Sequence, residues 1–85
     1  MAVPSSIHDT AYRELVDFLI EIRRVAGVTQ QQLGSSLGKP QSYVSKIERS
    51  ERRIDLVEFT AWVNALGIEP PVAYSAFLRR LSKHR

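Results

Sequence analysis

The sequence predicts an all-α fold of five helices in one domain, and three observations support this. Apolar residues recur at the three- and four-residue spacing of amphipathic helices, and no stretch alternates as a half-buried strand does. Capping patterns and glycines divide the chain into five such segments. The 85 residues, 44% of them hydrophobic, are enough to bury one compact core.

The first two helices are defined by their apolar spacing and by signals at their ends. An apolar stripe runs from 11 to 26, and Gly27 ends it. Thr29 and Gln32 have the spacing of a capping box, so a short second helix begins there and stops at Gly38. The stripe of the first helix consists of Tyr12, Leu15, Val16, Leu19, Ile22 and Ala26.

The third helix, over 41–49, is poor in apolar residues. Lys39 and Pro40 precede it, and proline is tolerated at a helix start because its missing N–H is not needed there. Val44 and Ile47 are its only large aliphatic residues. Most of its remaining side chains are therefore expected to face outward: Gln41, Ser42, Tyr43, Ser45, Lys46 and Arg49.

The last two helices complete the predicted domain. Asp55 and Glu58 form a second capping-box pattern, which starts a helix that ends at Gly67 and buries Trp62. Prolines 70 and 71 start a fifth helix. We expect a flexible segment at 1–10, one domain at 11–81 and a basic tail at 82–85. The apolar faces consist of Leu56, Phe59, Trp62, Val63 and Leu66 in the fourth helix, and Val72, Ala76, Phe77 and Leu81 in the fifth.

Positive charge is concentrated in one part of the chain. The net charge is +3, and residues 38–54, with five basic and two acidic residues, carry a balance of +3 by themselves. Such clustering is typical of proteins that bind polyanions. A charged face that only keeps the protein in solution is the alternative, and charge alone does not choose between them.

The residue inventory argues against an enzyme. There is no cysteine, and His8 and His84 stand in the terminal segments without metal-ligand spacing, so neither a metal site nor a cofactor is expected. The serines lack a nucleophile motif, and the glycines form no phosphate-binding loop. No apolar run is long enough for a membrane helix, and we expect a cytoplasmic protein.

The order of elements at 29–49 predicts a helix-turn-helix, a capped short helix followed by a tight turn and an apolar-poor helix. The second helix of such a pair enters the major groove of DNA. Glutamine, serine and tyrosine side chains suit contacts with base edges. The cations that follow suit contacts with phosphates: Lys46, Arg49, Arg52 and Arg53.

The run TQQQLGSSLGKPQSYVSKIERSERR resembles the Cro/C1-type (XRE-type) helix-turn-helix of phage repressors and bacterial regulators. The resemblance extends from about Leu19 to Gly67 and implies a lambda-repressor-like domain. It implies that Gln30 holds a phosphate and pairs with Gln41, which reads an adenine. It further implies base contacts by Ser42, Tyr43 and Ser45, with Lys46 at the edge of the groove and also a candidate for reading bases. Contacts with the DNA backbone are expected from Gln30, Lys39, Arg49, Arg52 and Arg53. Tyr43 has the alternative of packing on the domain.

The resemblance also assigns a structural role and marks two departures. Arg23 and Glu48 match a pair that forms a salt bridge between the first and third helices. Gly34 stands where the family usually has alanine. Ser50 stands where it has glycine, so either Ser50 adopts a left-handed conformation or the third helix continues toward Arg52.

The predicted function is that of a homodimeric repressor, bacterial or phage-encoded, that reads a palindromic operator. Val72, Ala76 and Phe77 are candidates both for capping the core and for meeting the same helix of a second subunit. A toxin or an anti-repressor is a further candidate partner. The alternative is a protein-interaction module on the same scaffold, for which DNA binding would be secondary.

Overall fold

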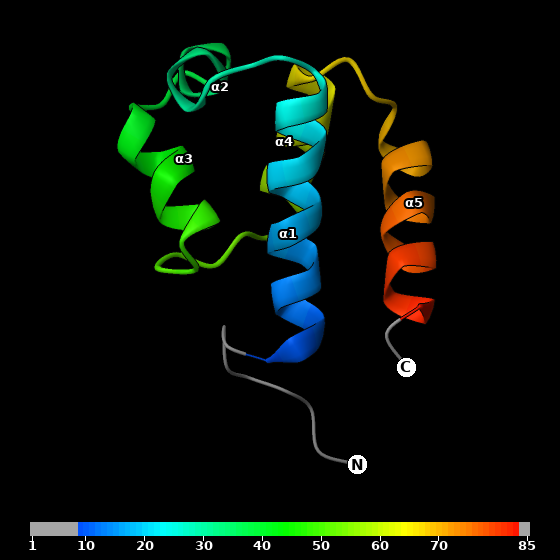
Figure 1. The fold of residues 1–85 in the computed structure, drawn as a ribbon. Coiled ribbons are helices and arrows are strands. Elements are labelled where there is room, and N and C mark those ends of the chain that lie inside the picture. The colour runs from blue at the N-terminus through cyan, green and yellow to red at the C-terminus, as the bar shows by residue number, and fades with distance from the viewer. Residues whose placement is uncertain (1–8, 84–85) are drawn as a thin grey trace.

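The computed structural model describes residues 9–83, which form five α-helices and no strand. The five-helix, all-α prediction is therefore confirmed for this part of the chain. Residues 1–8 of the expected N-terminal segment and 84–85 of the expected basic tail lie outside the described residues. The helices are α1 (Thr10–Val25), α2 (Gln30–Ser36), α3 (Gln41–Glu48), α4 (Leu56–Ala65) and α5 (Pro70–Ser82) (Figure 1).

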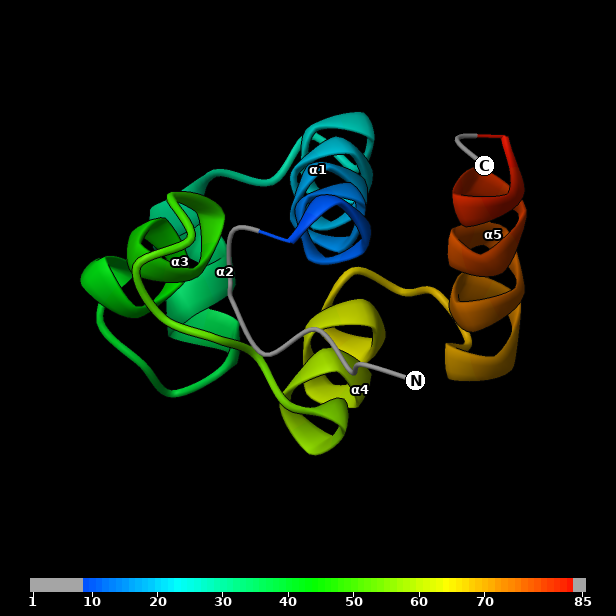
Figure 2. The same cartoon turned by 90° about the horizontal axis from the view of Figure 1, so that it is seen from below.

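Helix α1 lies at the centre of the domain, with the α2–α3 pair on one side and α5 on the other (Figure 1). Seen along α1, α4 closes the space between these two sides (Figure 2). As predicted, Val44 and Ile47 anchor α3, and Trp62 is a core residue; all three side chains are fully buried. The same core includes Tyr12, Val16, Phe18, Leu19, Leu33, Ile54, Phe59, Val63 and Ala73.

The helix starts agree with the predicted capping patterns. Thr29 Oγ1 accepts from the backbone N–H of Gln32 at 3.0 Å, and the Gln32 side chain accepts from the backbone N–H of Thr29 at 2.9 Å. Asp55 and Glu58 form the same reciprocal pair at the start of α4. These bonds satisfy backbone donors that a helix leaves unpaired in its first turn.

Helices α1, α2, α3 and α4 end in the same way. After each one, two backbone N–H groups reach back to carbonyls of the last turn, which is the Schellman arrangement. In each case the residue directly after the helix C-cap has a positive φ, between 60° and 78°, which allows this arrangement. It is glycine in three cases, at 27, 38 and 67, and Ser50 after α3.

Two large apolar residues do not lie where the sequence pattern predicted them. Leu56 is 72% exposed, because it is the first residue of α4 and extends beyond the core, while Ile54, two residues earlier, is buried. Val72 is 59% exposed, whereas Ala73 is buried. The small Ala73 side chain suits close packing of α5 on the domain, and this orientation turns Val72 toward solvent.

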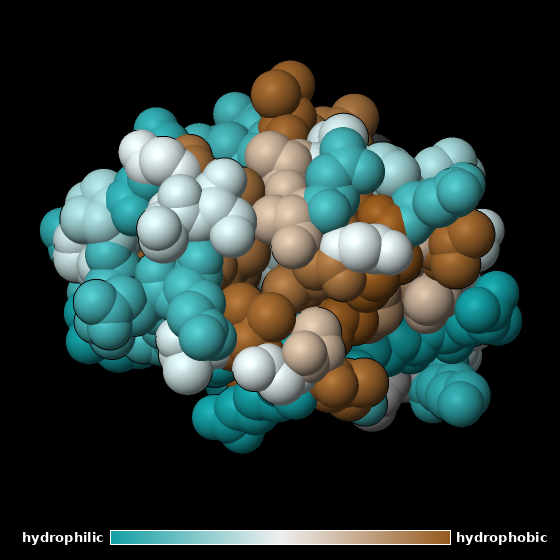
Figure 3. Space-filling view, turned by 90° about the horizontal axis from the view of Figure 1, so that it is seen from above, coloured by the Kyte–Doolittle hydropathy of each residue, from teal (hydrophilic) through white to brown (hydrophobic). Residues whose placement is uncertain are grey.

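The end of the domain formed by the last turn of α1 and the α4–α5 connection is apolar (Figure 3). Val25, Ile22, Leu66 and Ile68 line a shallow depression there, and Val25 is 82% exposed. Polar residues cover the adjoining surface over α2 and α3 (Figure 3). Among residues 9–83, no helix combines the length and the hydropathy needed to span a bilayer.

Candidate nucleic-acid interface

The turn between α2 and α3 brings the two helices into close contact. The backbone N–H of Lys39 donates to the carbonyl of Gly34 at 2.8 Å. A Cβ atom at position 34 would lie 2.9 Å from the carbonyl oxygen of Lys39 and 3.2 Å from that of Pro40. Real Cβ atoms essentially never approach backbone this closely. The glycine therefore allows the turn to pack directly on α2, and this contact determines where α3 begins.

The outer face of α3 is polar and accessible. Gln41, Ser42 and Lys46 are exposed, and Ser45 is half-buried with its hydroxyl donating to the carbonyl of Ser42 at 3.3 Å. On the opposite face of α3, Val44 and Ile47 are fully buried and anchor the helix to the core. The structure thus places four of the five expected base-reading residues on or beside one open face. The fifth, Tyr43, packs against the hydrophobic core.

A chain of hydrogen bonds connects the core to the start of α3. Arg23 of α1 donates from Nε to Glu48 Oε2 at 2.7 Å and from Nη2 to Glu48 Oε1 at 3.0 Å. Gln30 Nε2 donates to the same Glu48 Oε1 at 2.9 Å. Gln41 Nε2 then donates to Gln30 Oε1 at 3.2 Å. We call these four residues the Arg23–Gln41 relay.

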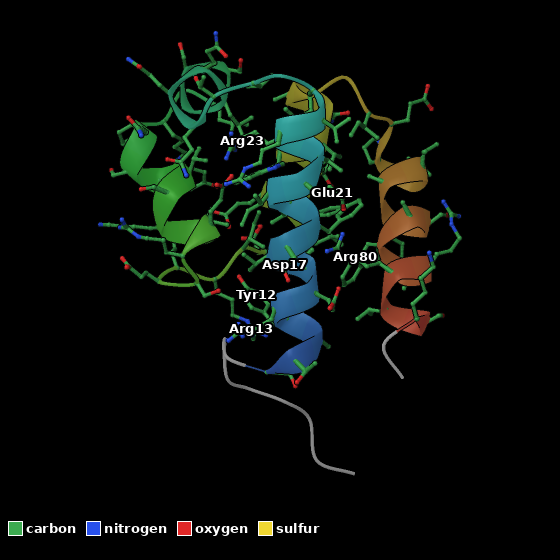
Figure 4. All side chains as sticks on the ribbon, viewed as in Figure 1. Tyr12, Arg13, Asp17, Glu21, Arg23 and Arg80 are labelled. Atoms are coloured by element: carbon green, nitrogen blue, oxygen red, sulfur yellow. The ribbon has the colours of Figure 1, made fainter. Side chains whose placement is uncertain are left out.

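The ion pair of the relay is buried, and its partners are held from several sides. The side chains of Arg23 and Glu48 are 9% and 5% exposed. Arg23 Nη1 also donates to the carbonyl of Val28 at 2.8 Å, and the side chain extends from α1 toward α3 (Figure 4). Removing one partner of such a pair costs about 3–5 kcal/mol, because the other charge stays buried. The pair expected from the sequence is present and ties α1 to α3.

The relay leaves Gln41 ready for a second partner. One hydrogen of its amide nitrogen points to Gln30, so the other hydrogen and the carbonyl oxygen are available on the exposed side. This donor and acceptor match N7 and the N6 amino group of adenine, which glutamine contacts in bidentate fashion. Because Gln30 is itself held by Glu48, its hydrogen bond orients the Gln41 amide.

Tyr43 is half-buried and packs against the hydrophobic core. Arg52 Cζ lies 4.9 Å from the centre of its ring, and Lys39 Nζ lies 5.3 Å from it. Burial raises the pKa of the Tyr43 hydroxyl, and the negative charge of Glu58 raises it further. Of the two roles left open by the sequence, packing on the domain is what the side chain does in this structure.

The arginines expected to contact phosphates already have partners within the domain. Arg52 forms a bidentate pair with Glu58, with nitrogen–oxygen distances of 3.1 and 2.9 Å. Arg53 lies over the Tyr12 ring at 4.5 Å, and Arg49 forms an exposed pair with Glu51 at 3.1 Å. The sequence suggested none of these contacts, except that Glu58 was recognised as a helix cap.

Ser50 resolves the question of where α3 ends. The helix stops at Glu48, and Ser50 adopts φ 60°. Its backbone N–H donates to the carbonyl of Ile47 at 3.0 Å, and that of Glu51 donates to the carbonyl of Lys46 at 2.8 Å. The alternative in which α3 continues toward Arg52 is therefore wrong. The connection is further held by the backbone N–H of Ile54, which donates to the Tyr12 hydroxyl at 3.0 Å.

The candidate residues for subunit contact differ from one another in exposure. Ala76 and Phe77 are partly buried, and the Phe77 ring lies 6.1 Å from that of Phe18 in α1. Arg80 adds ion pairs to Glu14 and Glu21 between α5 and α1 (Figure 4). Only Val72 of the three candidates is largely exposed.

An apolar groove lies beside these residues, between the start of α4 and α5. It has a volume of about 180 Å³, and Leu15, Phe59 and Phe77 form part of its wall. Leu56 and Tyr74 line it and are exposed, as are Val57 and Leu78 on the same two helices. The sequence pattern did not indicate that these four residues lie on the surface. Their large apolar side chains mark this surface. They can be recognised as exposed only when the direction in which each helix faces is known.

Comparisons with known proteins agree with this geometry. A family model described as helix-turn-helix matches residues 19–72. An XRE-family like protein from Pseudomonas syringae pv. tomato str. DC3000 is 42% identical, over 86% of this chain and 89% of its own, with a TM-score of 0.79. The wild-type restriction-modification controller protein C.Esp1396I has a TM-score of 0.82 over 91% of this chain and 100% of its own, but its 21% identity makes this a likeness of fold alone. A comparison with curated protein sequences gives no match.

Proposed function

The chain belongs to the XRE-type (Cro/C1-type) helix-turn-helix family, and from this premise we propose that it is a transcriptional repressor that binds a two-fold symmetric DNA operator as a homodimer. In this proposal α3 lies in the major groove, and α2 lies across the phosphate backbone. Occupying the operator is sufficient for repression, so the reading helix and a subunit contact are the only parts the function requires.

The observation that carries the proposal is the Arg23–Gln41 relay. It holds a carboxamide at the exposed start of α3, with one donor and one acceptor left for adenine. Ser42 and Lys46, on the same open face, are proposed to contact neighbouring base edges. Gln30 and the exposed Lys39 and Arg49 are proposed to contact phosphates, and such contacts fix the register of the protein on the duplex.

The subunit contact is proposed to lie on the apolar groove between α4 and α5. Leu56 and Tyr74 line it and are exposed, Val57 and Leu78 are exposed on the same two helices, and the exposed Val72 lies in the first turn of α5. A two-fold dimer uses the same surface on both subunits, so exposed residues of one copy fill the groove of the other. Phe77, a candidate from the sequence both for the core and for this contact, is a partly buried part of the groove wall and does not belong to its exposed residues.

Selection of bound duplexes from a random DNA pool tests the proposal directly. A palindromic site is expected, with half-sites about 10 base pairs apart or a multiple of this. Affinity for the site should fall steeply with salt, because each neutralised phosphate releases counterions. Absent or salt-insensitive binding would favour the protein-interaction module instead.

Gln41→Ala tests the reading role within this experiment. The variant should lose about 1–3 kcal/mol of discrimination at one base pair in each half-site, with little change on random DNA. Asn64→Ala is the matched control, because it removes another exposed carboxamide, this one from α4. Equal losses on the selected site and on random DNA would count against base reading by Gln41.

Leu56→Lys tests the subunit contact. A charge in an apolar contact between subunits must be desolvated, so this variant should sediment as a monomer and bind the selected site more weakly. Val25→Lys is the control, since Val25 is as exposed as Leu56 but lies at the end of α1. Loss of the dimer in Val25→Lys and not in Leu56→Lys would place the contact at the apolar end of the domain instead.

A further inference from the structure

Three residues from separate elements meet beside the reading helix: Tyr43 of α3, Arg52 of the α3–α4 connection and Glu58 of α4. We call this set the Tyr43 clamp. The Arg52 guanidinium lies over the Tyr43 ring at 4.9 Å, and both of its terminal nitrogens bind the Glu58 carboxylate at 3.1 and 2.9 Å. Arg52 Nη1 also donates to the carbonyl of Arg53 at 3.0 Å.

The carboxylate of the clamp is fixed independently of Arg52. Glu58 is the third residue of α4, and its Oε1 accepts from the backbone N–H of Asp55 at 3.0 Å as part of the capping box. The partial positive charge at a helix start favours a carboxylate there. Glu58 is thus held by α4, and it holds Arg52 in turn.

The second arginine pair nearby provides a contrast. Arg49 and Glu51 have side chains that are 60% and 53% exposed, so their pair is of the surface kind that contributes little and exchanges readily. Both pairs are bidentate, but in the clamp the side chains of Arg52 and Glu58 are only 43% and 22% exposed, and the guanidinium carbon lies 4.9 Å from the centre of an aromatic ring. Arg52 is therefore the more firmly held of the two cations.

We infer that Glu58 is a positioning residue that keeps Arg52 on Tyr43 and away from the DNA backbone, and so limits the sequence-independent part of the DNA affinity. The inference rests on the proposed function. Because a phosphate contact strengthens binding to every sequence alike, withholding one cation lowers affinity for the operator and for random DNA together. The contact between Arg52 and Tyr43 also restrains the Tyr43 ring, which belongs to the turn of α3 that carries Gln41 and Ser42.

Glu58→Gln is the informative variant. Glutamine also serves at the third position of a capping box, so α4 keeps its cap while Arg52 loses its counter-charge. The freed guanidinium is then expected to reach a phosphate. Glu69→Gln is the matched control, because it makes the same change of formal charge at the exposed residue before α5, whose side chain forms no capping hydrogen bond.

The measurement is the salt dependence of affinity for a random-sequence duplex of two helical turns, about 20 base pairs. One added phosphate contact per subunit should steepen the slope of log affinity against log salt by about 0.9. Between 50 and 200 mM salt, this steeper slope corresponds to a further loss of affinity of about 3.5-fold per subunit. Preference for the selected operator over random DNA should stay unchanged in both variants, because a phosphate contact strengthens binding to every sequence alike.

A double-mutant cycle shows whether the effect passes through Arg52. Arg52→Gln alone should leave the wild-type slope unchanged, and it should restore that slope when added to Glu58→Gln. The inference is overturned if Glu58→Gln is no steeper than Glu69→Gln, or if Arg52→Gln makes the wild-type slope shallower, because Arg52 would then already contact a phosphate. Absence of salt-dependent DNA binding by the wild-type chain would overturn the proposed function as well.

Discussion

Replacing Ser50 with glycine should make the domain more stable. Ser50 ends α3 with φ 60°, in the same Schellman arrangement that glycine provides after α1, α2 and α4. In the left-handed region the Cβ atom of an L-residue approaches backbone, which costs roughly 1–2 kcal/mol. Ser50 is the only non-glycine residue with positive φ among residues 9–83.

The expected gain is smaller than the strain that is relieved. Glycine loses more conformational freedom on folding than serine does, which offsets about 0.5–1 kcal/mol. Taking the middle of each range, about 1.5 less about 0.75, the net increase in the free energy of unfolding should be about 0.75 kcal/mol. For a domain of this size, each 1 kcal/mol raises Tm by roughly 4–8 °C, so a rise of about 3–6 °C is expected.

Urea and thermal unfolding can be followed by the fluorescence of Trp62, the single and fully buried tryptophan. Ser50→Ala is the control, because it removes the hydroxyl but keeps the Cβ atom that causes the strain. The reasoning is refuted if Ser50→Gly is no more stable than the wild-type chain, or if Ser50→Ala gains as much. In that case the backbone at this position would be unstrained despite its φ.

Two further predictions concern contacts that only the folded chain makes. Gly34→Ala should destabilise the domain by about 1 kcal/mol, because overpacking against the Lys39 carbonyl costs roughly 1–3 kcal/mol and helix propensity returns about 1; a gain in urea stability would contradict this. Hydrogen bonds from Arg52, and then from the backbone of Asp55, lower the pKa of Glu58. Because the pKa of Glu58 is lower in the folded chain, its carboxylate stabilises the fold at pH values above the ordinary pKa of 4.5. This stabilisation is lost as pH falls through the pKa of Glu58 in the folded chain. The stability difference between the wild-type chain and Glu58→Gln, measured in urea from about pH 6 to about pH 3, should therefore shrink as pH falls; a constant difference would show that the carboxylate charge does not contribute.

Local signals in the sequence were sufficient to predict the five helices and where the helix-turn-helix lies. The capping boxes at Thr29 and Asp55 involve residues three positions apart, and the glycines at 27, 38 and 67 act on the helix they follow. The near absence of apolar residues in α3, apart from Val44 and Ile47, identified its outer face. Interactions this short in range depend on neighbouring residues and hardly on the rest of the fold.

Tertiary structure alone decided what the charged and aromatic side chains of the site do. Arg52 and Glu58 are six positions apart across a turn, and their pairing depends on where α4 begins relative to α3. Tyr43 packs against the hydrophobic core with the Arg52 guanidinium over its ring, and Leu56 is exposed because α4 starts beyond the core. Sequence patterns reveal which residues share a face of a helix. The direction in which that face turns depends on how all five helices pack together, and here the packing assigned Arg52 to Tyr43 and left the Gln41 amide exposed.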